Sequence, residues 1–223
     1  MKPNLATLVF GIVAVATTNF AFAQGKQPIF NGKDFSGWHN YNSAGVTSIW
    51  RVDSGAIVLT GTNGGDLVTD ADYENFELEW EWKIASGGNS GVFYLVDERK
   101  DFATLDMTGA EYQIADNEQF KTKNLPKYHT GSCDGLYAPE VDATLPIGQW
   151  NKSKLRLRNG QVQHFLNGKL VLSYTLWTDQ WKADVASSKL RTKPAYGLAN
   201  KGKIGLQDHG DRVWYRNLYV TRL

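Results

Sequence analysis

Two stretches of the sequence each place a titratable side chain and an amide side chain two residues apart on an expected strand. Glu111 and Gln113 alternate with apolar residues, and Gln207 and His209 stand at the end of another apolar segment. Side chains two residues apart on a strand point to the same face. Carboxylate and imidazole groups are the usual proton-transfer groups of enzymes, so these residues suit a groove in which protons move.

A second group of polar residues lies on segments that are otherwise apolar. Glu77, Glu79 and Glu81 alternate along one face of a predicted strand, roughly 7 Å apart, and an ordinary solvated face with Lys or Arg on the neighbouring strand accounts for them. His164 shares a face with apolar residues, which favours a hydrogen-bonded core histidine over a site residue. Glu79, Glu81, His164 and Asp116 are therefore further candidates of second rank.

Several motifs that carry well-defined chemistry are absent from the sequence. It contains no His-Glu-x-x-His zinc motif, no Gly-x-Ser-x-Gly nucleophile elbow and no calcium-binding loop. The Glu-x-Asp-x-x-Glu strand of laminarinase-type retaining glycosidases is also missing, because Glu79-Trp80-Glu81 lacks the Asp and the downstream Glu. A direct two-carboxylate mechanism is weakened by this absence but stays open.

Composition excludes other classes of protein. The 223 residues carry 24 Lys and Arg against 23 Asp and Glu, so the chain lacks the strong positive field that nucleic-acid binding requires. With 42% hydrophobic and 13% aromatic residues, the chain can build a large core, and its length suits one all-β domain. Nothing in the composition indicates an oligomeric state.

The first 23 residues have the pattern of a secretory signal peptide. Lys2 precedes an apolar run over 5–22, and Ala21-Phe22-Ala23 is a small-x-small cleavage site. The competing interpretation is a membrane anchor, but the run is barely long enough to span and contains polar residues near its end. We expect cleavage after Ala23, a single domain over 24–223, a secreted or periplasmic location, and no membrane attachment after signal removal.

Alternation of apolar and polar residues dominates the chain from Trp50 onward. The segment 76–84 alternates without error, which predicts a long half-buried strand. Comparable segments follow at 56–60, 91–96, 111–115, 154–158, 161–166, 170–174, 204–207 and 213–220. Asn159-Gly160 and Asn167-Gly168 are typical of two-residue hairpin turns and predict a three-stranded meander over 154–174.

Evidence for helices is restricted to one segment. Only 179–190 has helical composition, with Thr178 or Asp179 as its cap. The stretches 97–110 and 116–149 are too long for simple turns, and we expect them to frame a site. The sequence thus predicts an all-β jelly-roll sandwich of two antiparallel sheets with one short helix.

Several stretches together resemble the 3-keto-disaccharide hydrolase domain family, a concanavalin-like family formerly classed as a domain of unknown function. The matching stretches occur in order at 29–38, 76–82, 88–93, 111–117, 163–168 and 204–210, with Trp214, Arg216 and Asn217. One departure is Cys133-Asp134-Gly135-Leu136-Tyr137, where the family tends to carry small residues before its Gly/Ala-Leu-Tyr segment, so the family's substrate preference is not carried over to this loop. The resemblance implies a jelly-roll sandwich, secretion and a sugar substrate oxidised at carbon 3.

The chemistry that the resemblance implies starts from that ketone. A carbonyl at C3 makes the C2 proton acidic, so a base can remove it and the enolate can expel the C1 aglycone, after which water either adds back or does not. Glu111 and His209 are the candidate catalytic pair, one as base and the other as proton donor or polarising group. The candidate sugar-binding residues are Asn89, Gln113, Gln207 and Arg216, with Tyr94 and Trp38 as stacking platforms. A divalent metal could polarise the ketone, but no spacing of ligands selects a set of residues.

Two other functions use the same fold. A carbohydrate-binding module or lectin would share the groove and its aromatic residues without turnover, but such a protein gains nothing from an acid–base pair such as Glu111 with His209. A direct retaining glycosidase would act through Glu79 and Glu81. In all three cases the partner is a carbohydrate.

Overall fold

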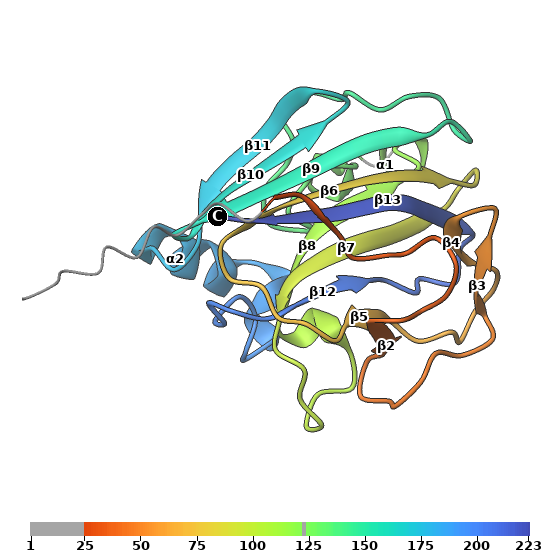
Figure 1. Ribbon diagram of the computed structural model, residues 1–223. Coiled ribbons are helices and arrows are strands. Elements are labelled where there is room, and N and C mark those ends of the chain that lie inside the picture. Colours follow the sequence, from red (N-terminus) through yellow and green to blue (C-terminus); the bar gives the residue numbers. More distant parts are fainter. Residues whose placement is uncertain (1–24, 122–123) are drawn as a thin grey trace, which may run out of the picture.

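The computed structural model of the protein describes residues 25–121 and 124–223. Within these residues, strands form two antiparallel sheets that pack face to face (Figure 1), so the predicted all-β sandwich is confirmed. The predicted signal peptide over 1–23 lies outside the described residues. In the described part of the chain, no helix is long and apolar enough to cross a membrane.

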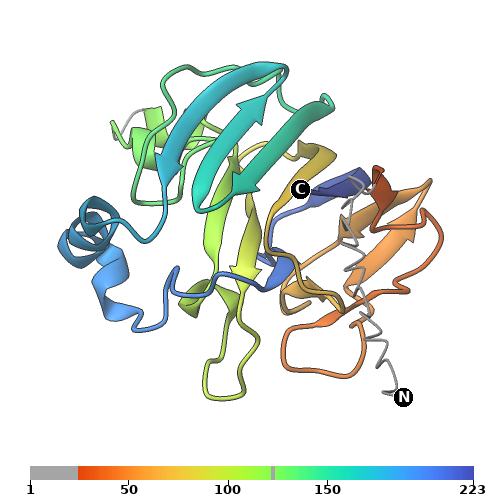
Figure 2. The same ribbon diagram turned by 60° about the vertical axis from the view of Figure 1, so that its left-hand side comes forward.

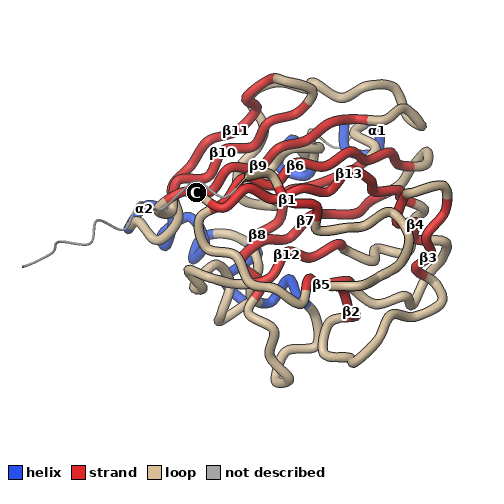
Figure 3. Tube along the Cα trace, in the orientation of Figure 1, coloured by secondary structure: helices blue, strands red, loops and turns tan. Residues whose placement is uncertain are grey.

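The two sheets differ in size and are called here the large sheet and the small sheet (Figure 3). In spatial order, the large sheet contains β11 (Lys169–Thr175), β10 (Gln161–Leu166), β9 (Asn151–Arg158), β6 (Phe76–Ile84), β13 (Val213–Arg222), β4 (Ala56–Leu59) and β3 (Trp50–Asp53), with β1 (Gln27–Pro28) beside β13. The small sheet contains β2 (Trp38–Asn40), β5 (Leu67–Thr69), β12 (Lys203–Leu206), β7 (Asn89–Val96) and β8 (Ala110–Ala115).

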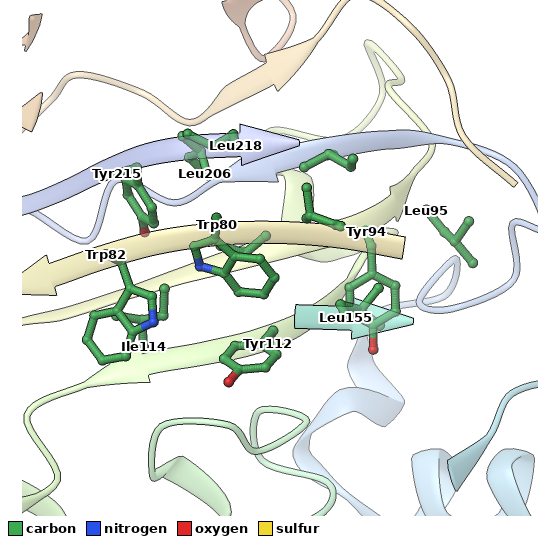
Figure 4. Packing of buried hydrophobic residues seen from close by; sticks show 14 of the residues in the cluster. Trp80, Trp82, Tyr94, Leu95, Tyr112, Ile114, Leu155, Leu206, Tyr215 and Leu218 are labelled. Atoms are coloured by element: carbon green, nitrogen blue, oxygen red, sulfur yellow. The ribbon is translucent and has the colours of Figure 1, made fainter. Parts of the chain in front are cut away.

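The core lies between the sheets and is rich in aromatic rings (Figure 4). β6 contributes the inward-facing half of its alternating sequence, including Trp80 and Trp82, which are almost completely buried. Trp80 packs edge-on against Tyr112 of β8 with ring centroids 4.9 Å apart. The Trp82 indole N–H donates to Ser153 Oγ at 2.9 Å, and Ser153 donates in turn to the Tyr112 hydroxyl at 3.0 Å. These contacts fix β8 against the large sheet.

The outward-facing half of β6 is the solvated face that the sequence predicts. The three glutamates make ion pairs with basic residues: Glu77 with Arg156 at 3.4 Å, Glu79 with Lys26 at 2.8 Å, and Glu81 with Arg216 at 2.8 Å. Register explains two of the pairs, because Glu77 lies opposite Arg156 on β9 and Glu81 lies opposite Arg216 on β13.

The connections follow the turn chemistry of the sequence. Asn159, Gly160, Asn167 and Gly168 all have positive φ angles, as the two hairpins of the β9–β10–β11 meander require. Helix α2 (Asp179–Ser187) begins at Thr178, whose side chain accepts the Trp181 N–H. It ends three residues earlier than predicted.

Other helical segments and the shortest strands were not predicted. They are the short helix α1 (Glu118–Lys121), the 3₁₀ turns η1 (Leu105–Met107), η2 (Pro126–Tyr128) and η3 (Lys189–Thr192), and the strands β1, β2, β3 and β5. Figure 2 shows the chain leaving β11 for α2 and returning past β7 and β8 before it enters β12. The Gly197 N–H donates to the Thr108 carbonyl on this path at 2.8 Å.

The Trp80–Tyr112 contact generates a prediction about stability. Trp80→Ala should lower the free energy of unfolding by about 3–5 kcal/mol, because it leaves a cavity between the sheets. Trp214→Ala is the matched control: Trp214 is half-buried on β13, where its ring contacts the Lys83 ammonium at 4.5 Å, and its loss should cost about 1 kcal/mol. Urea denaturation measures both, and equal losses would contradict the assignment of the core.

Candidate functional site

A row of residues crosses the small sheet at the point where β12 and β5 meet their flanking loops. Gly91 on β7 lies opposite Gln113 on β8, and the Gln207 N–H donates to the Gly91 carbonyl at 3.0 Å. Because Leu206 lies opposite Leu67, the next pair in that register is Gln207 and Asp66. Gln113, Gly91, Gln207 and Asp66 therefore follow one another across β8, β7, β12 and β5.

This row lies on the outer face of the small sheet, away from the core. Tyr112 and Ile114 point into the core, so Glu111 and Gln113, which alternate with them, point outward. On β7, the Ser90 hydroxyl meets the Tyr215 hydroxyl of the large sheet at 2.7 Å, so its neighbour Gly91 also lies on the outer face.

The carboxyl group of Glu111 lies directly over the backbone of Gly91. A Cβ atom at Gly91 would stand 2.1 Å from Glu111 Oε1, so any side chain there would displace the carboxyl group. Glu111 is only 6% exposed. Burial is the largest cause that raises the pKa of Glu111 well above its usual value, and the nearby Asp134 carboxylate adds to it. Glu111 thus holds its proton at a pH where an exposed glutamate is ionised.

A chain of polar contacts flanks Glu111 on the side of the 116–149 segment. The Gln113 amide donates to Asp134 at 3.1 Å, and the Lys189 ammonium donates to the other oxygen of Asp134 at 2.7 Å. Lys189 lies against Gly135, where a Cβ atom would meet its Cε atom at 2.3 Å and where φ is +68°. Glycine at this position therefore lets the Lys189 side chain reach Asp134.

A second ion pair approaches the site from the segment that contains η1. Asp106 pairs with Lys193, and both charges act on Glu111. Asp106 also acts on Asp66, and burial raises the pKa of Asp66 to about 6. Asp66 lines a hollow of about 390 Å³ together with His209 and other residues. Asp106 thus acts on the carboxyl groups of both Glu111 and Asp66.

Two amide oxygens at the site have no hydrogen-bond partner. Asn89 Oδ1 and Gln207 Oε1 are enclosed without a donor among the described residues. Buried polar atoms are normally satisfied, so these two amide oxygens are exceptions among the described residues. The backbone N–H of Asn89 is already held by Asp211 at 3.0 Å, which fixes the start of β7.

The structure brings several of the predicted site residues together. Glu111, Gln113, Gln207 and Asn89 come from β7, β8 and the end of β12. His209 lies farther along the chain, at the hollow beside Asp66, where its Nδ1 atom is 3.6 Å from Asp211 and its side chain is 51% exposed. Among the described residues, no hydrogen bond or ion pair joins His209 to Glu111.

Other predicted residues lie elsewhere. Arg216, Glu79 and Glu81 lie on the outer face of the large sheet, where they form the ion pairs described above. They do not share a groove with Glu111, so the prediction that Arg216 binds sugar beside Glu111 is wrong. Tyr94 and Trp38 are buried, with 0% and 4% exposure. A stacking platform needs an exposed ring face, and the prediction that these two residues stack against sugar is therefore wrong.

His164 and Asp116 have structural positions. His164 is completely buried, its Nδ1 atom lies 3.0 Å from the Gly131 carbonyl, and burial lowers its pKa to about 4. The preferred interpretation as a core histidine is confirmed. The carboxylate of Asp116 accepts the N–H groups of Gly87 at 2.8 Å and Glu118 at 3.2 Å, which ties the β6–β7 turn to α1.

Sequence analysis missed the charged residues that reach the site from connecting segments, namely Asp66, Asp106, Asp134, Lys189 and Lys193. None of them belongs to an alternating pattern. The departure at Cys133-Asp134-Gly135 and the length of the 97–110 and 116–149 segments were the available signals. In residues 25–121 and 124–223, no three His, Cys, Asp or Glu side chains gather as metal ligands would.

The chain is similar to known proteins over most of its length. A family model described as a 3-keto-alpha-glucoside-1,2-lyase-like domain matches residues 25–221. A curated protein from Bacteroides thetaiotaomicron, named 3-keto-disaccharide hydrolase, is 38% identical over 230 residues, which cover 90% of this chain and 79% of that protein.

Solved structures with the same fold include proteins named as glycosyl hydrolases and a carbohydrate binding module. One from Parabacteroides distasonis, named as a candidate glycosyl hydrolase, has 34% identity and a TM-score of 0.81, covering 89% of this chain and 94% of that one. A second from the same organism, named in the same way, has 28% identity and a TM-score of 0.69, covering 89% and 99%. A carbohydrate binding module from Bacillus subtilis, at 12% identity and a TM-score of 0.53 over 83% of this chain and 95% of that one, shares the fold alone.

The buried carboxyl group makes stability depend on pH. Between the usual pKa of glutamate, about 4.3, and the raised pKa in the folded protein, the unfolded chain has lost the Glu111 proton and the folded protein retains it. Stability should therefore fall as pH rises through this window, by about 1.4 kcal/mol per pH unit from this group. Glu111→Gln should remove this slope and exceed the wild type in stability at the upper end of the window.

Urea denaturation from about pH 5 to about pH 8 tests the prediction, with the difference between the two proteins taken at each pH. A difference that does not change with pH would show that Glu111 titrates normally in the folded protein.

Proposed function

The chain belongs to the family of 3-keto-alpha-glucoside-1,2-lyase-like domains, and on that basis we propose that it cleaves 3-keto-glycosides by abstraction of the C2 proton and elimination of the C1 aglycone. The resemblance found in the sequence is thereby confirmed, and with a relative named 3-keto-disaccharide hydrolase at 38% identity, the chain is an enzyme that cleaves glycosidic bonds. The position of Glu111 is the observation that carries the proposed mechanism.

The elimination needs a base, a group that stabilises negative charge and a proton donor. The base takes the C2 proton, and the C2–H electron pair forms the C2=C3 bond of an enolate, with negative charge on the C3 oxygen. When the carbonyl re-forms, the pair moves into the C1=C2 bond and the C1–O bond breaks with its electrons going to the aglycone oxygen. Because the C3 carbonyl carries the negative charge of the intermediate, no oxocarbenium ion forms. Preorganised positive charge near that oxygen lowers the barrier.

Glu111 is the base in this proposal. A carboxyl group whose pKa is raised is a stronger base once it is ionised. Because Gly91 has no side chain, the Glu111 carboxyl group can lie over the outer face of the small sheet. The ammonium groups of Lys189 and Lys193 both act on Glu111 and are the nearby sources of positive charge for the enolate. His209, at the edge of the site, is assigned as the donor to the departing aglycone oxygen.

Binding of the sugar is assigned to the amide groups of Asn89, Gln113 and Gln207. The oxygens of Asn89 and Gln207 have no protein donor, and a rotation of either amide group toward the site would let it accept a hydrogen bond from a sugar hydroxyl. A pure lectin would also use such acceptors, but it would have no use for a carboxyl group whose pKa is raised by burial. The direct glycosidase alternative is disfavoured, because Glu79 and Glu81 are held by Lys26 and Arg216.

The place of action is also a proposal. The apolar run and cleavage site within residues 1–23 support export, and 3-keto-glycosides would then be cleaved outside the cytoplasm, in the periplasm or after secretion.

The central test replaces the base and a matched residue on the opposite face of the molecule. With a 3-keto-glucoside, Glu111→Gln should lower kcat by about 10²–10⁴-fold, because the amide cannot take the C2 proton. It should also abolish the rise of kcat/KM with pH that accompanies ionisation of Glu111. Glu79→Gln alters a carboxylate of similar size on the large sheet and should leave turnover unchanged.

The parent glucoside without the ketone is the control substrate, and it should not be cleaved at a measurable rate. Comparable cleavage of both substrates, or loss of activity in Glu79→Gln rather than Glu111→Gln, would replace the elimination mechanism with the direct glycosidase. Sugar binding without turnover of either substrate would favour the lectin.

A further inference from the structure

Asp66 is the last residue of the row formed by Gln113, Gly91, Gln207 and Asp66, and Glu111 lies near the other end of that row. The Glu111 carboxyl group lies over Gly91, and Asp66 follows two strands away, with Gln207 between them. Two strand spacings of about 4.8 Å each place the backbones of Gly91 and Asp66 about 10 Å apart. In glycosidases, two carboxyl groups about 6.5–9.5 Å apart leave room for a water molecule beside the sugar, and the spacing of the row is of this order.

The surroundings of Asp66 suit a water molecule. Asp66 lines the hollow of about 390 Å³ together with Tyr41, Thr104 and His209, and its Oδ1 atom accepts the Asp208 N–H at 2.9 Å. Asp208, the other carboxylate there, has both oxygens engaged, because they accept the N–H groups of Gly65 at 2.9 Å and Gly210 at 2.8 Å.

The charged groups around Asp66 favour a base that works near neutral pH. Burial, Asp106 and Asp208 raise its pKa to about 6, against the N–H groups of Asp208 and Leu105, which lower it. His209 faces the same hollow, and Lys193 neutralises part of the Asp106 charge. Asp66 is therefore ionised near neutral pH, whereas Glu111 carries the proton that it took from C2 once the elimination is complete. Carboxyl groups whose pKa values are set apart by their environments commonly divide the acid and base roles.

We propose that Asp66 is the base that activates water for addition to C1, so that one site carries out elimination and then hydration. This inference rests on the proposed function. Water loses a proton to the Asp66 carboxylate, its oxygen forms a bond to C1, and the C1=C2 electron pair moves toward the C3 carbonyl. C2 then takes back the proton held by Glu111. The products are the free 3-keto sugar and the aglycone, and Asp66 returns its proton to solvent.

The test separates the two steps by their products. Full-length wild-type protein, Asp66→Asn and the control Asp70→Asn are supplied with a 3-keto-glucoside, and the released aglycone, the unsaturated 3-keto sugar and the hydrated 3-keto sugar are quantified. The wild type should form hydrated sugar. Asp66→Asn should lower the ratio of hydrated to unsaturated sugar by about 10²-fold or more, the effect of losing a positioned base. Asp70 is exposed and lies beyond the other end of β5, so its variant should keep the wild-type ratio.

A second measurement supplies the unsaturated 3-keto sugar directly and follows hydration against pH. The wild-type rate should fall as pH drops through about 6, and Asp66→Asn should lack this dependence. Normal hydration by Asp66→Asn, or a wild type that releases aglycone and only unsaturated sugar, would overturn the role of Asp66 and leave the elimination intact. Absence of aglycone release by the wild type would instead refute the proposed function.

Discussion

The site depends on the close approach of the Glu111 carboxyl group to the bare backbone of Gly91. A Cβ atom on Gly91 would stand 2.1 Å from a carboxyl oxygen of Glu111. Residue 91 must therefore lack a side chain if the carboxyl group is to occupy this position. The position removes most of its solvent, and the loss of solvent keeps its proton in place. An environment that disfavours the ionised Glu111 carboxylate lowers the free energy of unfolding at pH values where the unfolded chain is ionised. The same environment makes the carboxylate a strong base when it does ionise.

The two outer faces of the sandwich show how differently the same residue types behave. On the large sheet, the glutamates of β6 face basic residues and form a solvated surface. On the small sheet, connecting segments bring Asp106, Asp134, Lys189 and Lys193 over the strands and enclose Glu111 among them. The aromatic contacts of Trp80 and Tyr112 in the core hold β8 in the register on which this arrangement depends.

Much of the fold could be predicted from the sequence, because long strands repeat a period of two over many residues. The strand 76–84 and the two Asn-Gly hairpins are confirmed. Strands of two to four residues, such as β2 and β5, are too short to show a period. The exposure of an aromatic ring is not encoded in its type either, which is why Tyr94 and Trp38 were assigned to sugar stacking although both lie in the core.

The site residues on regular strands could be predicted from the sequence, whereas those in connecting segments could not. Glu111, Gln113 and Gln207 interrupt apolar strands, and the alternation itself marks them. Asp66 and Asp134 stand in irregular segments and Lys189 begins the 3₁₀ turn η3. Only the pairing of β5 with β12 and the passage of the chain over β8 bring them near Glu111. Tertiary contacts of that kind leave no periodic trace in the sequence.

The most direct measurement of the account is the fate of the C2 hydrogen. Cleavage of a 3-keto-glucoside in deuterium oxide, followed by analysis of the hydrated product, reports whether the C2–H bond breaks during turnover. Because Glu111 is expected to exchange its proton with solvent before returning it, the account predicts deuterium at C2 of the 3-keto sugar. A product that carries its original hydrogen at C2 under these conditions would contradict elimination and indicate displacement at C1.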